Sequence, residues 1–177
     1  MKDIALHIMD ILQNSTRAKA TKIELNIEEN LAKDTLTIMF KDNGHGMSEE
    51  TLEQVLNPFF TTRTTRKVGL GLSLLKQSAE FTGGTLTIHS ELDVGTTVTV
   101  TFGLSHIDRP PLGDVAGTIV LTASAYPDIH FRMHYKTDKV DYIFDTQEIN
   151  EALDGVSIQE PEIVQYLIEM TRENMMI

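Results

Sequence analysis

The segment NPFFTTRTTRKVGLGLSLLKQ, residues 57–77, combines features that a protein core does not require. Two phenylalanines precede four threonines and three cations, and a Gly-Leu pair then repeats at the start of an apolar run. A helix that begins at such glycines exposes backbone amides, and its positive dipole end favours an anion. Because the segment holds Arg63, Arg66 and Lys67 without any acidic residue, it predicts a triphosphate site. The alternative is a glycine-rich hinge.

Hydrophobic periodicity on both sides of this segment predicts an α+β protein. We expect helices over residues 3–18, 48–56, 71–82, 113–125, 148–156 and 160–173. We expect strands over residues 21–29, 35–42, 85–90, 95–102, 129–136 and 139–146. This order favours helices on one face of a largely antiparallel sheet.

The paired prolines Pro110 and Pro111 follow a change in charge and indicate a domain boundary. Residues 1–104 carry 10 Lys and Arg against 13 Asp and Glu, whereas residues 105–177 carry 5 against 13. We therefore expect an N-terminal domain of residues 1–104 and a small acidic α+β appendage of residues 105–177. Such acidity argues against general nucleic-acid or anionic-membrane binding, which needs a positive face. It favours an interaction surface for a second copy or another protein.

The composition excludes several other classes of protein. The chain has no cysteine, so it has neither a disulfide framework nor a thiolate zinc site. Neither a signal peptide nor an apolar run long enough to span a bilayer is evident. We therefore expect a cytoplasmic protein.

The first predicted helix carries a polar stripe beside its apolar one. His7, Asp10, Asn14 and Arg17 follow one another at steps of three or four, so they share one face. One interpretation is a solvated face. The other is a site for magnesium and phosphates, because a hard cation prefers oxygen ligands such as an Asn carbonyl and arginine binds phosphate oxygens.

The motif DNGHGM, residues 42–47, directly follows a predicted strand. One interpretation is an ordinary turn, since Asp, Asn and Gly favour turns. The functional interpretation makes Asp42 the acceptor for an exocyclic amine. Gly44 and Gly46 would then let the backbone approach a flat base closely.

These motifs occur in a set order, and the sequence resembles the ATP-binding module of the GHKL superfamily over residues 1–104. This superfamily includes gyrase, heat-shock chaperones, histidine kinases and mismatch-repair ATPases, and the resemblance is to the histidine-kinase branch. Residues 10–25 resemble the asparagine box, 42–47 the first glycine box, 57–63 the phenylalanine box and 69–76 the second glycine box. Residues 95–102 resemble the strand that places a threonine beside the adenine.

The resemblance implies the Bergerat fold, a two-layer α/β sandwich with helices on one face of a mixed, mostly antiparallel sheet. It also implies ATP and Mg²⁺ as cofactors and makes residues 57–77 a flexible lid over the nucleotide. Asn14 would hold the metal, and Asp42 and Thr96 the adenine. The other residues that it assigns to nucleotide binding are Arg17, Gly44, Gly46, Phe59, Thr62, Arg63, Gly69, Leu70 and Gly71.

One position departs from the hydrolytic members of the superfamily, which place a glutamate four residues before the magnesium asparagine. Here that residue is Asp10, whose carboxylate is shorter by about one carbon–carbon bond. Because a misplacement near 1 Å can cost on the order of a hundredfold in rate, we expect slow hydrolysis. Asp10 could instead assist a protein nucleophile or support the magnesium shell.

No more than three residues precede the first predicted helix, so we expect no dimerising acceptor hairpin in this chain. His106 partly matches a phosphoacceptor pattern, but Ile107 stands where an acid is required and Pro110 opposes a helix. We interpret His106 as a linker residue, and His45, His89, His130 and His134 as structural. The preferred hypothesis is phosphoryl transfer to a partner protein, as in stand-alone serine kinases of anti-sigma circuits. The alternatives are a nucleotide-sensing module and a slow ATPase.

Overall fold

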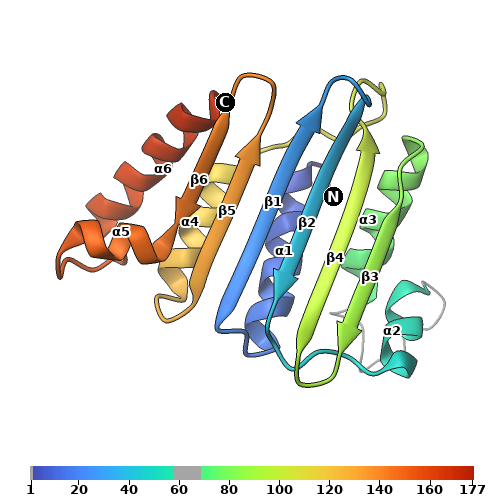
Figure 1. Cartoon of the computed structure of the whole chain (residues 1–177), viewed down its shortest axis with the longest axis horizontal. Helices are drawn as coiled ribbons and strands as arrows, with labels where there is room; N and C mark the ends of the chain where they lie inside the picture. The colour runs from blue at the N-terminus through green and yellow to red at the C-terminus, as the bar shows by residue number, and fades with distance from the viewer. Residues whose placement is uncertain (1, 58–68) are drawn as a thin grey trace.

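The strands form one open sheet, and helices cover one of its faces (Figure 1). The computed structural model describes residues 2–57 and 69–177. The helices are α1 (Ile4–Arg17), α2 (Glu49–Leu56), α3 (Gly69–Phe81), α4 (Val115–Ala125), α5 (Thr146–Leu153) and α6 (Pro161–Met175). The strands are β1 (Lys22–Asn30), β2 (Thr35–Asp42), β3 (Leu86–Glu91), β4 (Gly95–Gly103), β5 (His130–Lys136) and β6 (Asp141–Asp145).

The strand order is β3-β4-β2-β1-β5-β6, and each neighbouring pair is antiparallel except β1 with β5. This mixed, mostly antiparallel sheet confirms the predicted α+β class. Strands β1 and β2 form one antiparallel pair and β3 and β4 form another, and β2 also pairs with β4, which joins the two pairs. Helices α1, α3 and α4 lie behind the sheet in Figure 1.

Local signals explain where the first helices begin. Asp3 caps α1 by accepting a hydrogen bond from the Leu6 amide at 2.9 Å. Ser48, where the predicted helix over residues 48–56 begins, caps α2 by accepting from the Thr51 amide at 3.2 Å. Such caps satisfy amides that have no partner within the helix, so they define its first residue.

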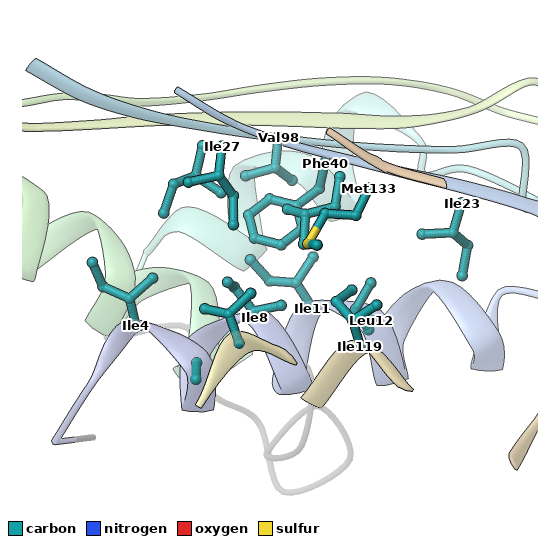
Figure 2. Close-up of a cluster of buried hydrophobic side chains, with 14 of the residues drawn as sticks. Ile4, Ile8, Ile11, Leu12, Ile23, Ile27, Phe40, Val98, Ile119 and Met133 are labelled. Atoms are coloured by element: carbon teal, nitrogen blue, oxygen red, sulfur yellow. The ribbon is translucent and has the colours of Figure 1, made fainter. Parts of the chain in front are cut away.

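The core lies between the sheet and α1. Figure 2 shows Ile4, Ile8 and Ile11 of α1 facing Phe40 and Val98 of the sheet. The C-terminal region contributes to the same core, through Met133 of β5 and Ile119 of α4. The sheet and its core therefore continue across residue 104, where composition alone had indicated a boundary.

The C-terminal region is also joined to the start of α1. The first two amides of α1, those of Ile4 and Ala5, donate to the carbonyls of Pro111 and Leu112 at 2.9 and 2.8 Å. Helix α4 packs against α1. The helix that carries the predicted polar stripe is therefore held at its N-terminus by the segment after β4.

Asp145 at the end of β6 supports a prediction about pH. Its carboxylate interacts with His130 Nε2 at 2.8 Å and accepts from the Gln147 amide at 2.9 Å. Burial alone would raise the pKa of Asp145, but these hydrogen bonds lower it on balance below its ordinary value of 3.8. A lowered pKa stabilises the fold at neutral pH, and this contribution is lost as the pH falls through the folded-state pKa.

We therefore expect Asp145→Asn to lower the free energy of unfolding at pH 7 by about 1 kcal/mol, equivalent to roughly 2–4 °C in Tm. At pH 3, below the ordinary carboxyl pKa of 3.8, the deficit relative to the unmodified protein should be smaller, because the stabilisation is lost as the pH falls toward the lowered pKa of the native carboxylate. Thermal unfolding at both pH values measures this. The exposed Asp138→Asn variant is the matched control, and an equal deficit at both pH values would contradict the prediction.

Candidate functional site

A pocket lies between α1 and one end of the sheet, and it gathers residues from distant motifs. Its apolar lining includes Ile11, Phe40, Met47, Leu72 and Val98. Its polar lining includes Asn14, Ser15, Arg17, Asp42, His45 and Thr96. An apolar pocket with a few convergent polar groups suits a flat ring system with polar edges. The structure thus brings together the predicted residues of α1, of the DNGHGM motif and of β4.

Asp42 is fixed at the end of β2 by two hydrogen bonds. Ser15 Oγ donates to Oδ2 at 2.6 Å, and the Gly44 amide donates to Oδ1 at 2.9 Å. A carboxylate offers about four acceptor positions, so both oxygens can accept further bonds. The carboxylate is therefore held in one orientation and can still accept from an amine on a ligand.

Thr96 lies directly opposite Asp42 in the pairing of β2 with β4. Its hydroxyl shares a hydrogen bond with Ser90 Oγ at 2.8 Å, and Ser90 Oγ also accepts from the Met47 amide at 2.8 Å. Ser90 thus ties β3, the DNGHGM loop and Thr96 together. This network orients the threonine hydroxyl at the same end of the sheet as the carboxylate.

Sequence reasoning did not identify Ser15 or Ser90, although each carries a recognisable signal. Ser15 occupies the apolar stripe of α1, four residues after Ile11, and is 4% exposed. Ser90 occupies the inward alternation of β3, two residues after Ile88. A polar side chain at a position where the hydrophobic pattern places the core needs a hydrogen-bond partner. That partner is Asp42 for Ser15 and Thr96 for Ser90.

We expect Ser15→Ala to weaken ATP binding about tenfold, because Asp42 loses a hydrogen bond to a charged acceptor. Isothermal titration with ATP measures the change. Thr16→Ala is the matched control, since the Thr16 hydroxyl donates only to the Gln13 carbonyl within α1. Equal affinities for the two variants would contradict a role for Ser15 in holding Asp42.

The glycines of the DNGHGM loop approach other parts of the protein closely. A Cβ placed at Gly44 would lie 2.7 Å from Ala18 Cβ. Gly46 has a φ of +68°, and a Cβ there would overlap the Glu91 carbonyl. Both positions therefore require glycine for packing against α1 and the β3–β4 turn. Their approach to a nucleotide base stays a prediction.

Two side-chain oxygens of the α1 stripe are buried without a partner among the described residues: Asp10 Oδ2 and Asn14 Oδ1. A Cβ at Gly71 would overlap the Asp10 carboxylate, so this side chain lies against the first turn of α3. Burial raises the pKa of Asp10, and the charge of Arg17 opposes this in part. An unpartnered amide oxygen beside a carboxylate is suited to bind a cation or a reacting group.

Magnesium fits this arrangement, because a hard cation takes neutral and charged oxygens and retains several waters. The described residues hold no cluster of three or more His, Asp or Glu side chains that could form a complete metal cage. Asn14 would therefore share a bound Mg²⁺ with phosphate oxygens and water. Mg²⁺ commonly binds proteins in this way.

Part of the predicted site lies outside the described residues, namely Phe59, Thr62 and Arg63, together with Arg66 and Lys67. Gly69 and Leu70 begin α3, two residues before the helix start that we predicted at residue 71. The lid over the nucleotide therefore stays a prediction.

The histidines that we interpreted as structural have different surroundings. His45 lines the pocket, and its Nδ1 donates to the Gly46 carbonyl at 2.9 Å. His130 and His134 on β5 contact aspartates of β6 at 2.8 and 2.6 Å. Of the predicted structural histidines, His45 is thus the one that the structure places at the site.

Comparison with known proteins identifies the family. Residues 2–106 match the family model for the histidine kinase-, DNA gyrase B- and HSP90-like ATPases. The chain belongs to this family. The matched residues include every pocket-lining residue named above, so the pocket lies within the GHKL ATP-binding module.

Among the curated relatives are histidine kinases that are much longer than this chain. The sensor histidine kinase YvrG of Bacillus subtilis is 31% identical over 99 residues, which are 52% of this chain and 17% of that protein. The histidine protein kinase SaeS of Staphylococcus aureus is 31% identical over 101 residues, or 53% of this chain and 29% of that protein. The chain thus spans less than a third of these relatives.

Solved structures confirm the GHKL fold. The MutL ATPase domain of Aquifex aeolicus, complexed with ADP, aligns with a TM-score of 0.58 at 15% identity. The alignment covers 96% of this chain and 70% of that domain, so it extends into the C-terminal region. The N-terminal domain of a DNA repair protein aligns with a TM-score of 0.57 at 16% identity, over 82% of this chain and 52% of that one.

None of the helices described here has the length and apolar character needed to cross a bilayer.

Proposed function

We propose that this GHKL protein binds Mg²⁺-ATP and transfers the terminal phosphate to a partner protein in a cytoplasmic signalling circuit. The observation that carries the proposal is the pair of unpartnered oxygens on α1, Asp10 Oδ2 and Asn14 Oδ1. They lie one helical turn apart, near the apolar pocket and the first turn of α3. A triphosphate and its cation would satisfy both groups.

Each residue then has a specific role. Asp42 accepts from the adenine amine, and Thr96 supports the base through the Ser90 network. Asn14 holds Mg²⁺, which would neutralise charge on the phosphates when bound. Arg17 and the amides of Gly69 and Gly71 bind the phosphates, together with the lid.

Asp10 would accept the proton of the attacking hydroxyl or imidazole. A general base works best when its pKa lies near the working pH, and burial moves the pKa of Asp10 in that direction. The tight contact with Gly71 limits the positions that the carboxylate can adopt. A carboxylate confined in this way suits a general base that accepts a proton from one defined position.

The acceptor in this proposal belongs to another molecule. His106 lies in a turn after β4, at the end of the strand opposite to Thr96. The seven residue steps from Thr96 to Gly103 span about 24 Å at a typical strand rise. The acidic C-terminal region offers a surface for the partner, or for a second copy in a homodimer.

A nucleotide sensor with little turnover is the second candidate function. The aspartate at position 10, where hydrolytic family members have a glutamate, favours it. The packing of α4 on α1 also favours it, because a shift of α1 on nucleotide binding would be passed directly to the C-terminal region. A slow ATPase is a third outcome of the same site.

ATP labelled on its terminal phosphate, followed for hours with Mg²⁺ and the purified chain, separates these functions. Label on an added candidate partner supports transfer, and its stability in acid distinguishes a serine phosphate from a histidine phosphate. Free labelled phosphate indicates an ATPase. Label that stays in ATP, despite confirmed binding and an added candidate partner, would contradict transfer and favour the sensor. A parallel reaction with a magnesium chelator is the control.

A further inference from the structure

His7 of α1 is a buried polar residue whose side chain makes no hydrogen bond to the described residues. It is 2% exposed, and neither Nδ1 nor Nε2 has a partner. The other buried polar side chains all form hydrogen bonds; they are Ser15, Thr82, Ser124, Thr146 and Thr171. Because folded proteins pair nearly all buried polar groups, an unpaired interior imidazole indicates a partner that is acquired in another state.

The position of His7 on α1 shows which partner is available. The described residues have four unpartnered buried side-chain nitrogen and oxygen atoms, and they belong to His7, Asp10 and Asn14. Spacings of three and four place these residues on one face of the helix, and neighbours three apart have Cβ atoms about 5–6 Å from each other. His7 therefore lies one turn from Asp10, on the side away from Asn14. The Asp10 carboxylate lies between this histidine and the metal position.

The chemistry of the two side chains is complementary. Burial lowers the pKa of His7, although the charge of Asp3 opposes this in part, so the ring is neutral at physiological pH. A neutral imidazole has one N–H donor, and a carboxylate needs donors. Asp10 Oδ2 has no donor in the described structure. Because the contact with Gly71 confines the Asp10 carboxylate, a rotation of the His7 side chain would let the pair form one hydrogen bond and satisfy both groups.

We propose that His7 is a positioning residue for Asp10, and that its ring N–H donates to the Asp10 carboxylate when Mg²⁺-ATP is bound. The bond holds one carboxylate oxygen and leaves the other directed at the attacking group. This is how bases in other enzymes are oriented by a third group. The inference rests on the proposed function, in which Asp10 accepts a proton. The hydrogen bond from His7 would offset the shorter reach of the aspartate by restricting the orientation of its carboxylate.

The first test is nuclear magnetic resonance of the full chain labelled with ¹⁵N in its histidine rings. The His7 signals are assigned by their loss in His7→Gln. A non-hydrolysable ATP analogue with Mg²⁺ should shift them to one tautomer with a hydrogen-bonded N–H, and Asp10→Ala should abolish that response. An unchanged His7 ring, or the same change in Asp10→Ala, would overturn the proposal.

The second test compares two variants in the labelled-phosphate reaction. His7→Phe fills the volume without a donor, and His7→Gln keeps an N–H. We expect His7→Phe to lower the turnover rate about tenfold while the Kd for ATP stays constant, and His7→Gln to restore most of the rate. Equal rates for the two variants, or a parallel loss of ATP affinity, would show that His7 only fills the core. Thermal unfolding confirms that both variants are folded.

The two tests separate this proposal from the proposed function. If the wild-type chain shows no turnover but its His7 ring forms the nucleotide-dependent bond to Asp10, phosphoryl transfer fails and the contact stands. If turnover occurs and the ring does not respond, the transfer stands and the role of His7 fails.

Discussion

Asp42→Asn is expected to abolish measurable ATP binding, with a loss of at least about a hundredfold in affinity. The carboxylate is held by Ser15 and Gly44 in an orientation that leaves acceptor positions for an amine. An asparagine replaces one of its oxygens with an NH₂ group. This group cannot accept from Ser15 or Gly44, nor from the adenine amine, so a buried donor is left unsatisfied.

Titration calorimetry with ATP measures this effect, and thermal unfolding checks that the variant is folded. Asp93→Asn is the matched control, because Asp93 is exposed in the nearby β3–β4 turn. ATP binding that survives Asp42→Asn with unchanged affinity would mean that the nucleotide lies elsewhere. A loss of affinity in both variants would point to a general charge effect and not to adenine recognition.

Asp10→Ala is expected to leave the Kd for ATP nearly unchanged and to lower turnover by about 10²–10⁴-fold, the usual contribution of a general base. Asp10 lies on the α1 stripe against Gly71, whereas the groups assigned to adenine binding, Asp42 and Thr96, line the pocket. Its removal should therefore affect the reaction and not the binding of adenine. Single-turnover measurements with labelled ATP, at saturating nucleotide, isolate this step.

Asp10→Glu is the companion variant. It should speed hydrolysis if the site works as in the hydrolytic family members and the reach of the carboxylate is limiting. A nucleotide sensor should instead bind ATP as before and show no turnover in either variant. Turnover that is unaffected by Asp10→Ala would remove Asp10 from the reaction.

Much of the architecture follows from local patterns. The apolar period of α1 and the alternation of β1 and β2 predicted these elements within a few residues, because each pattern reports which side of an element faces the core. The predicted helix over residues 48–56 begins at Ser48, whose hydroxyl caps α2. The motif order predicted the GHKL family, which the match over residues 2–106 confirms.

The position of the C-terminal region was not predictable in the same way. Paired prolines and a change in charge indicated a boundary near residue 104, but β5 pairs in parallel with β1 and extends one sheet. Parallel pairing joins strands that are about a hundred residues apart here, and no local pattern records such a partner. The alternation of β5 shows only that one face is buried, and not which strand lies beside it.

The sequence by itself determined the types of element, their order, the family and the chemical identities of Asn14, Asp42 and Thr96, because these depend on residue type and spacing along the chain. Only the tertiary structure decided which of these groups are paired. Ser15 holds Asp42, whereas Asp10, Asn14 and His7 have buried atoms without partners among the described residues. Burial and hydrogen bonding depend on neighbours that folding brings from other parts of the chain, so the unsatisfied groups that mark the site exist only in three dimensions.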